Sequence, residues 1–185
     1  LHLSIRRQRQ MCIRDSPYVF MKKLFEGLEE NDIVVTGNGS ACVVSFQAAE
    51  IKKGQRLFTN SGCASMGYGL PAALGACIAE GEKRVICLDG DGSLMMNLQE
   101  LQTIRYNNCN MKLFVLNNNG YHSIRQTQNN LFKNGLIGVC DGNGVNFPPF
   151  DKLADTFGFK YFKIDSLDGI EEKLQEVLNT DGPVL

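Results

Sequence analysis

Two apolar runs, each long enough for a buried strand and each ending in small polar residues, constrain the fold of this chain most. The first run ends in residues 90–93 (Gly-Asp-Gly-Ser) and the second in residues 117–120 (Asn-Asn-Asn-Gly). Between them, the apolar residues of 94–104 recur at the spacing of one helical face. Strand, helix and strand in this order predict two parallel strands, whose carboxyl ends and polar loops lie at one edge of a sheet.

The same alternation runs through the rest of the chain. Apolar runs predict strands at 32–37, 56–62, 84–90, 112–118 and 160–164, with a further strand starting at Pro183. Helical patterns occupy 41–50, 66–80, 94–106, 150–158 and 170–178, and a long polar connection covers 129–146. The pattern indicates an α/β fold with a mainly parallel sheet and helices on both faces.

Length and the two ends define the expected domain. With 185 residues and 43% apolar content, one domain is expected, and we assign it to residues 17–185. Residues 1–16 are arginine-rich and lack the apolar centre of a signal peptide, so we predict a non-native or disordered leader. The last strand stops two residues after Pro183, which predicts a truncated C-terminal strand.

Composition excludes several classes of function. The formal net charge is −1 with no basic stripe, which argues against nucleic-acid binding. No apolar run approaches the ~18 residues of a membrane helix, so a soluble protein without a membrane partner is expected. The seven cysteines form no C-x-x-C pair, which favours free thiols and a cytoplasmic location.

Each polar loop has a structural and a functional interpretation. The glycines around Asp91 allow a backbone to approach a phosphate and place a carboxylate near a cation, but the motif alone is better explained as a strand-to-helix turn capped by Ser93 or Asp91. Residues 117–120 alone fit an ordinary loop, because Asn and Gly tolerate left-handed backbone. The pair is more informative: 27 residues separate Asp91 from Asn118, enough for a helix and a returning strand. An acid, an amide and a carbonyl would then converge, as Mg²⁺ prefers.

Gly-Asp-Gly followed after about 25 residues by Asn-Asn is the signature of thiamine diphosphate-dependent enzymes, and the chain resembles this family. "GCASMGYGLPAALGA" and "GDGSLMMNLQELQTI" are similar to the C-terminal cofactor-binding domain of its acetolactate synthase and pyruvate decarboxylase group. The resemblance covers residues 17–185, and "MGYGLPAALGA" is most like the acetolactate synthase large subunit.

The resemblance implies a cofactor site with Mg²⁺ held by Asp91, the side chain of Asn118 and the main-chain oxygen of Gly120. The residues implied to surround thiamine diphosphate are Gly39, Ser40, Ala64, Met66, Gly90, Asp91, Gly92, Ser93, Asn118, Gly120 and Tyr121. Gly92 and Ser93 would contact the diphosphate, with help from Gly39 and Ser40. The family often has Gln-His near Ser40, where this chain has Ser-Ala.

Two residues have implied catalytic roles, each with a simpler alternative. Met66 matches the apolar residue that holds the two cofactor rings in a V, although methionine at a helix start also suits a core. His122 would donate a proton, or it would be a solvated loop residue. Ala64 would offer its carbonyl to the aminopyrimidine, and Arg125 would pair with a substrate carboxylate or cap a helix.

The implied activity is decarboxylation of a 2-oxo acid such as pyruvate, followed by carboligation. The activating glutamate of this family lies in a pyrimidine-binding domain, usually on a second subunit, so a homodimer or homotetramer is expected. FAD would bind only in another part of the full-length protein. Alternatives are another thiamine diphosphate-dependent lyase or transferase, acting on oxalyl, sulfo or sugar-derived substrates, and a non-catalytic regulatory domain.

Overall fold

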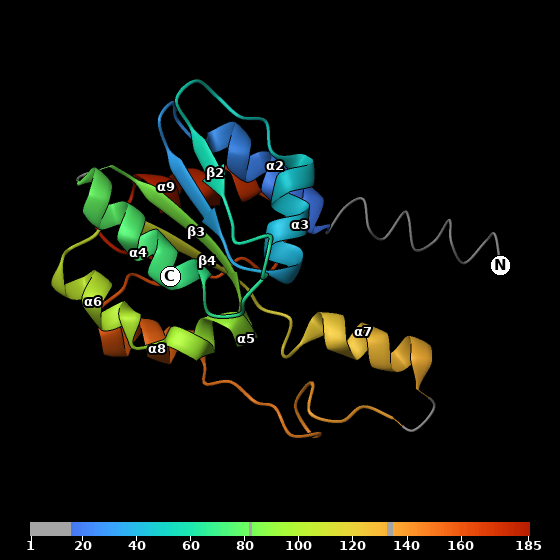
Figure 1. Ribbon diagram of the computed structural model, residues 1–185. Coiled ribbons are helices and arrows are strands. Elements are labelled where there is room, and N and C mark those ends of the chain that lie inside the picture. The colour runs from blue at the N-terminus through green and yellow to red at the C-terminus, as the bar shows by residue number, and fades with distance from the viewer. Residues whose placement is uncertain (1–15, 82, 133–134) are drawn as a thin grey trace.

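The computed structural model describes residues 16–81, 83–132 and 135–185. Within this part of the chain, four parallel strands pair in the order β2-β1-β3-β4. Their bounds are β1 Ile33–Thr36, β2 Arg56–Phe58, β3 Val85–Gly90 and β4 Met111–Leu116. Val35 pairs with Cys87, and Cys87 with Leu113, so the strands end together at one edge (Figure 1). The predicted α/β class with a parallel sheet is confirmed.

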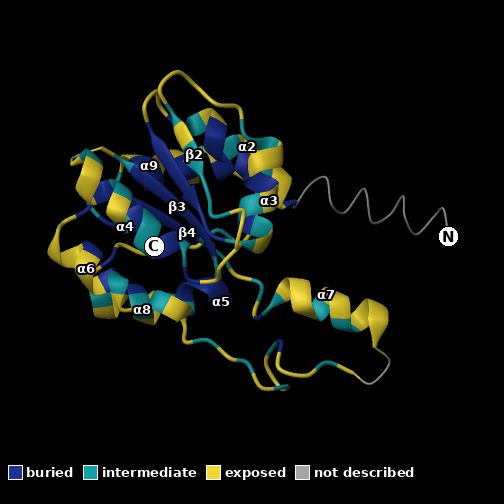
Figure 2. Ribbon diagram, in the orientation of Figure 1, coloured by how far each residue is buried: buried dark blue, intermediate teal, exposed yellow. Residues whose placement is uncertain are grey.

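Helices cover both faces of the sheet, because alternate residues of its strands are apolar on both sides. Val85 and Cys87 of β3 pack on one side with α4 (Gly69–Glu80), α6 (Glu100–Tyr106) and α8 (Phe150–Phe157). Ile86 and Leu88 pack on the other with α2 (Pro17–Gly27), α3 (Gly39–Ala48) and α9 (Ile170–Asn179). Figure 2 shows β3 buried between these two groups of helices.

Two helices differ from their predicted extents. The helix expected at 66–80 begins at Gly69, because Gly67 has a φ of +80°, which a right-handed helix cannot contain. The helix expected at 94–106 is divided into α5 (Asp91–Leu94), a 3₁₀ turn at Met95–Asn97, and α6. Both changes place additional turns beside the carboxyl edge of the sheet.

Helix α7 (His122–Leu131) was not predicted, although it directly follows the polar loop after β4. None of its ten residues, all within the described chain, is buried. It extends away from the sheet in Figure 1 and is largely exposed in Figure 2. Helix α2 was also not predicted; the Ser16 side chain caps it by accepting the Tyr18 N–H at 3.2 Å. The predicted leader otherwise lies outside the described residues.

The segments predicted as strands at 160–164 and 183–185 form single bridges beyond β4. Val184 pairs in parallel with Lys112 on one side and with Lys160 on the other. Val184 N–H donates to Met111 at 2.9 Å, and Leu185 N–H donates to Lys160 at 2.9 Å. The last residues therefore lie between β4 and the 160–162 segment.

A buried lysine fastens this region at the amino end of β4. The Lys112 ammonium donates to Asn110 Oδ1 at 2.7 Å and to the carbonyls of Thr180 at 2.6 Å and Gly182 at 2.7 Å. Burial, with the nearby Arg84 charge, lowers the pKa of Lys112 to about 8. At the same edge, Arg84 Nε donates to the buried Asp32 carboxylate at 3.1 Å.

In the described ranges, no helix is both long and apolar enough to span a bilayer.

Candidate cofactor site

A cavity of about 230 Å³ opens at the carboxyl edge of the sheet, where the loops after β1, β3 and β4 meet. The turn before α4 completes its wall. Eleven predicted site residues line it: Gly39, Ser40, Met66, Gly90, Asp91, Gly92, Ser93, Asn118, Gly120, Tyr121 and His122. Only Ala64 of the predicted set is not among the lining residues; it has a φ of +48° in an exposed loop. The sequence therefore predicted residues that the fold brings together.

Asp91 joins the ends of β3 and β4. Its side chain is 2% exposed, and Oδ2 accepts the backbone N–H groups of Asn118 at 2.8 Å and Gly120 at 3.0 Å. Its Oδ1 accepts the N–H of Gly92 at 2.7 Å. The carboxylate thus fixes the polar loop after β4 against the turn after β3.

These oxygen groups fit a Mg²⁺ ion. Each carboxylate oxygen has two acceptor positions, so Asp91 Oδ1 keeps one after accepting Gly92. Among the described residues, the Asn118 side chain, which lines the cavity, makes no hydrogen bond with another group. No cluster of three His, Cys, Asp or Glu side chains suited to a metal occurs in the described chain. The predicted ligands use one carboxylate with an amide and a carbonyl, which suits a hard cation that retains water or phosphate ligands.

Close contacts require glycine at two positions, one in the loop after β4 and one in the turn after β3. Gly120 has a φ of +136°, and an added Cβ would lie 2.0 Å from the carbonyl oxygen of Val139. At Gly92, an added Cβ would lie 2.3 Å from the ring of Tyr121. Tyr121 also meets the Phe147 ring edge to face, with centroids 6.2 Å apart. The wall of the cavity is therefore packed directly against the backbone of the turn after β3.

Ser93 connects this turn to the one that carries Met66. Ser93 Oγ, in a buried side chain, accepts the N–H of Gly67 at 2.9 Å. The Gly67 carbonyl accepts Nδ2 of Asn97 at 2.7 Å. Met66 is 37% exposed, lines the cavity, and belongs to neither of the two buried apolar clusters. Its side chain is available to a ligand, and its backbone is held by its neighbour.

A second carboxyl, Asp89, lies behind the cavity at the end of β3. It is fully buried, and Oδ2 has no hydrogen-bond partner among the described residues. Burial raises the pKa of Asp89 to about 6, against opposing contributions from the Ser93 hydroxyl and the Gly90 N–H. From the sequence, Asp89 was taken only as the end of an apolar strand. Its acidic side chain at a strand position that faces the core was the feature that could have identified it.

The residues after the loop lie at the mouth of the cavity. His122 is exposed at the first position of α7. Arg125 donates from Nη2 to the carbonyl of Asn118 at 3.0 Å, so in this structure it braces the polar loop. Neither predicted alternative for Arg125 included this contact. Other lining residues that were not predicted are Asn38, Ala41, Leu116, Ser123 and Ile124.

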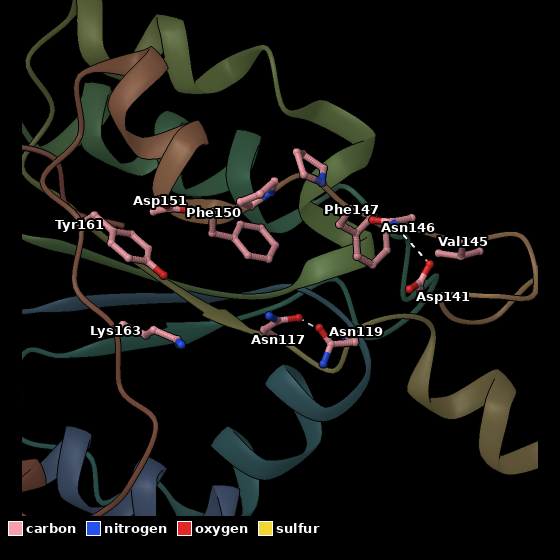
Figure 3. Close-up of a pocket in the computed structure, with 12 residues that line it drawn as sticks. Asn117, Asn119, Asp141, Val145, Asn146, Phe147, Phe150, Asp151, Tyr161 and Lys163 are labelled. Atoms are coloured by element: carbon pink, nitrogen blue, oxygen red, sulfur yellow. Dashed lines mark hydrogen bonds between the residues drawn. The ribbon is translucent and has the colours of Figure 1, made fainter.

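A larger cavity, about 780 Å³, lies on the other side of the same loop (Figure 3). Asn117 and Asn119 line it, opposite Tyr161 and Lys163. The Asn119 N–H donates to Asn117 Oδ1 at 3.0 Å. Another cavity, about 850 Å³, is lined by Asn117, Asn118 and Asn119 together. Of these three cavities, only the smallest is lined by all three predicted metal ligands, and we treat it as the cofactor site.

A parallel α/β domain with an acid, an amide and glycine-rich turns converging at its carboxyl edge defines a class of proteins that bind phosphorylated cofactors. The family model for "Thiamine pyrophosphate enzyme, C-terminal TPP binding domain" matches residues 37–185. The chain therefore belongs to the thiamine pyrophosphate (thiamine diphosphate) enzymes, as their C-terminal cofactor-binding domain. The family predicted from the two polar loops is confirmed.

Curated relatives are acetolactate synthases. The chain is 31% identical to acetolactate synthase isozyme 1 large subunit of Escherichia coli (strain K12), over 94% of this chain and 30% of that protein. It is 32% identical to acetolactate synthase 1, chloroplastic, of Nicotiana tabacum, over 91% of this chain and 26% of the relative. The chain thus spans less than a third of the length of these relatives.

Proposed function

We propose that this domain binds thiamine diphosphate through Mg²⁺ and contributes the cofactor half of the active site of an acetolactate synthase-like carboligase. The observation that carries the proposal is the convergence of Asp91, Asn118, Gly120 and Met66 on one cavity from separate segments of the chain. The first three supply the oxygens that suit Mg²⁺, and the fourth supplies an accessible apolar side chain.

Each group has a distinct role in this proposal. Asp91 and Asn118 hold the cation, with the Gly120 carbonyl as third protein ligand. Ser93 would donate to the diphosphate; Gly92 would contact it through its backbone, whose N–H already donates to Asp91 Oδ1 in this structure. The bound cofactor supplies the electron sink for decarboxylation of a 2-oxo acid. Met66 supports its rings. In favourable cases, holding the reacting groups in the correct orientation lowers a reaction barrier by about 7–11 kcal/mol.

Fewer residues of this chain are candidates for the substrate side of the site. His122 at the cavity mouth is our candidate proton donor, and Tyr121 lines the cofactor wall. Ala64 remains our candidate for the aminopyrimidine contact, because it lies two residues before Met66, which lines the cavity. Arg125, engaged with Asn118, is better suited to bracing the loop than to pairing with a substrate.

We further propose that residues 17–185 act within a longer enzyme and receive the activating glutamate from a pyrimidine-binding domain of a second subunit. The share of the relatives' length that the chain spans, 30% and 26%, supports this. We also propose that the protein works as a homodimer or homotetramer on a 2-oxo acid such as pyruvate, and that it is cytoplasmic. Any FAD site would lie outside this domain.

Titration calorimetry on the complete protein tests this function, with thiamine diphosphate as the ligand and Mg²⁺ present or chelated. We expect Mg²⁺-dependent binding and release of carbon dioxide from pyruvate. Cofactor binding with turnover of an oxalyl, sulfo or sugar-derived substrate alone would favour the other lyase and transferase class. Absence of cofactor binding would favour the non-catalytic domain and contradict the proposal.

A further inference from the structure

At the carboxyl edge of the sheet, Asp89 occupies the space that side chains at Gly37 and Gly69 would otherwise fill. An added Cβ at Gly37, just after β1, would lie 2.0 Å from Asp89 Oδ1. An added Cβ at Gly69, the first residue of α4, would lie 2.7 Å from Asp89 Oδ2. The same Cβ at Gly69 would lie 3.0 Å from the Cα of Gly37. One carboxyl therefore sets how closely the end of β1 and the start of α4 approach β3.

Burying a carboxyl group at this position lowers the stability of the fold unless the group makes a favourable interaction. Asp89 is 0% exposed, and Oδ2 lacks a hydrogen-bond partner in the described chain. A buried polar group without a partner costs about 1–3 kcal/mol. An apolar residue of similar size would fill the same space without that penalty. The carboxyl is therefore kept at a cost in stability, in the space that the two glycines leave for it.

The start of α4 links Asp89 to the turn that carries Met66. Gly69, whose missing side chain leaves room for Asp89 Oδ2, lies three residues after Met66. The Gly67 N–H donates to Ser93 Oγ at 2.9 Å, which holds the same turn against the turn after β3. Packing of Asp89 against Gly69 therefore fixes one end of the segment that carries Met66.

We propose that Asp89 is a positioning residue that fixes two walls of the cofactor cavity. It sets the loop after Gly37, which carries Gly39 and Ser40, by direct packing. It sets the start of α4, directly after the turn that carries Met66, by packing against Gly69. The inference rests on the proposed cofactor site, and it assigns to Asp89 no contact with the cofactor itself.

The test uses the complete protein with four variants. Asp89→Ala removes the carboxyl, and Asp89→Asn keeps its shape and one acceptor oxygen. Asp32→Ala is the matched control, because Asp32 is also a buried acid at the end of a sheet strand, but at the opposite edge. Asp91→Ala tests the cofactor site independently. The two readouts are the thiamine diphosphate dissociation constant with Mg²⁺ present and hydrogen exchange of the Gly67 amide in the cofactor-free protein.

We expect Asp89→Ala to raise the dissociation constant about 10-fold or more, which corresponds to ~1.4 kcal/mol. Gly67 exchange should accelerate at least as much. Asp89→Asn should stay within about 3-fold of wild type, and Asp32→Ala should lower the melting temperature without changing either readout. Unchanged binding in Asp89→Ala, or an equal loss in Asp32→Ala, would overturn the inference.

The outcome for Asp91→Ala separates this inference from the proposed function. If Asp91→Ala abolishes binding and Asp89→Ala does not weaken it, only the role of Asp89 is wrong. If Asp91→Ala binds normally, the cofactor site itself is wrong. Should Asp89→Ala fail to fold, Gly37→Ala carries the test, because its added Cβ would lie 2.0 Å from Asp89 Oδ1 and would displace that carboxyl without removing it. Cofactor binding and Gly67 exchange that stay unchanged in Gly37→Ala would overturn the inference.

Discussion

The Asp91 carboxylate accepts the backbone N–H of Asn118 at 2.8 Å, across 27 residues of chain. The same side chain that we assign to Mg²⁺ thus also builds the loop that supplies the other two ligands. Metal binding and loop structure are therefore coupled in one group. This coupling determines what substitution of Asp91 should do.

Asp91→Ala in the complete protein should abolish Mg²⁺-dependent cofactor retention, because no other predicted ligand carries a charge. It should also lower the melting temperature of the cofactor-free protein, because three backbone N–H groups lose their acceptor. Cofactor content after gel filtration and melting curves measure both effects. Asp141→Ala, which removes an exposed acid of the neighbouring cavity, is the control and should change neither. Normal cofactor content in Asp91→Ala would refute the metal assignment.

Met66→Ala should reduce the turnover rate about 10-fold or more, equivalent to ~1.4 kcal/mol of barrier. The melting temperature without cofactor should change little, because Met66 is 37% exposed and lies outside the apolar clusters. Met21→Ala is the contrast: Met21 is fully buried, and its truncation should cost about 2–5 kcal/mol of stability. Paired melting and steady-state kinetics distinguish the two patterns. Unchanged turnover in folded Met66→Ala would contradict the ring-supporting role.

Gly120→Ala should destabilise the polar loop by more than backbone strain alone. Gly142 provides the comparison, since it has a φ of +77° but no described atom within 4 Å of an added Cβ. Gly142→Ala should therefore cost about 1 kcal/mol, as expected for strain. Gly120→Ala adds a clash with the Val139 carbonyl, so both stability and Mg²⁺ affinity should fall further. Chemical denaturation of the two variants checks this, and equal losses would show that the close contact relaxes.

The lowered pKa of Lys112 predicts a pH dependence of stability. Between about pH 8, where the folded lysine titrates, and its ordinary value of 10.5, the unfolded chain binds more protons than the folded one. The free energy of unfolding that Lys112 contributes should therefore rise with pH across this window. The measurement is chemical denaturation of wild type and Lys112→Met at pH 7.5 and 9.5. If the difference in free energy of unfolding between wild type and Lys112→Met is the same at both pH values, the lowered pKa is contradicted. The buried cysteines contribute equally to both proteins, so their contribution cancels in this difference.

Continuous apolar runs and amphipathic helices were predictable from the sequence. The strands β1, β3 and β4 are runs of mostly buried apolar residues, and the helices α8 and α9 each have one apolar face, so both patterns are visible without tertiary information. Helix α4 was indicated by its alanine-rich composition. Helix α7 buries none of its described residues and contains only two apolar side chains, Ile124 and Leu131, too few to indicate a helix from the sequence. Helix α4 starts late because of Gly67, whose conformation depends on the contact with Ser93.

The candidate site was predictable because its residues are local exceptions in apolar surroundings. Asp91 and Asn118 interrupt strand ends, and parallel strands bring such ends together. Asp89 was not assigned, and the contact of Arg125 with Asn118 was not predicted, because the partners of both side chains are set by packing rather than by spacing. The space that Gly37 and Gly69 leave around Asp89 forms only when β1, β3 and α4 are assembled.

The bridging of Val184 to both Lys112 and Lys160 has a consequence for the order in which the domain assembles. The 160–162 segment leaves the ribosome before the residues that join it to β4. It must wait unpaired while about twenty further residues are added at roughly 5–20 residues per second, a delay of about one to four seconds. During synthesis, the core around β3 is able to close first, and this edge of the sheet is completed later. An exposed strand edge during that interval is the point at which a nascent chain of this kind is most open to chaperones and to misassembly.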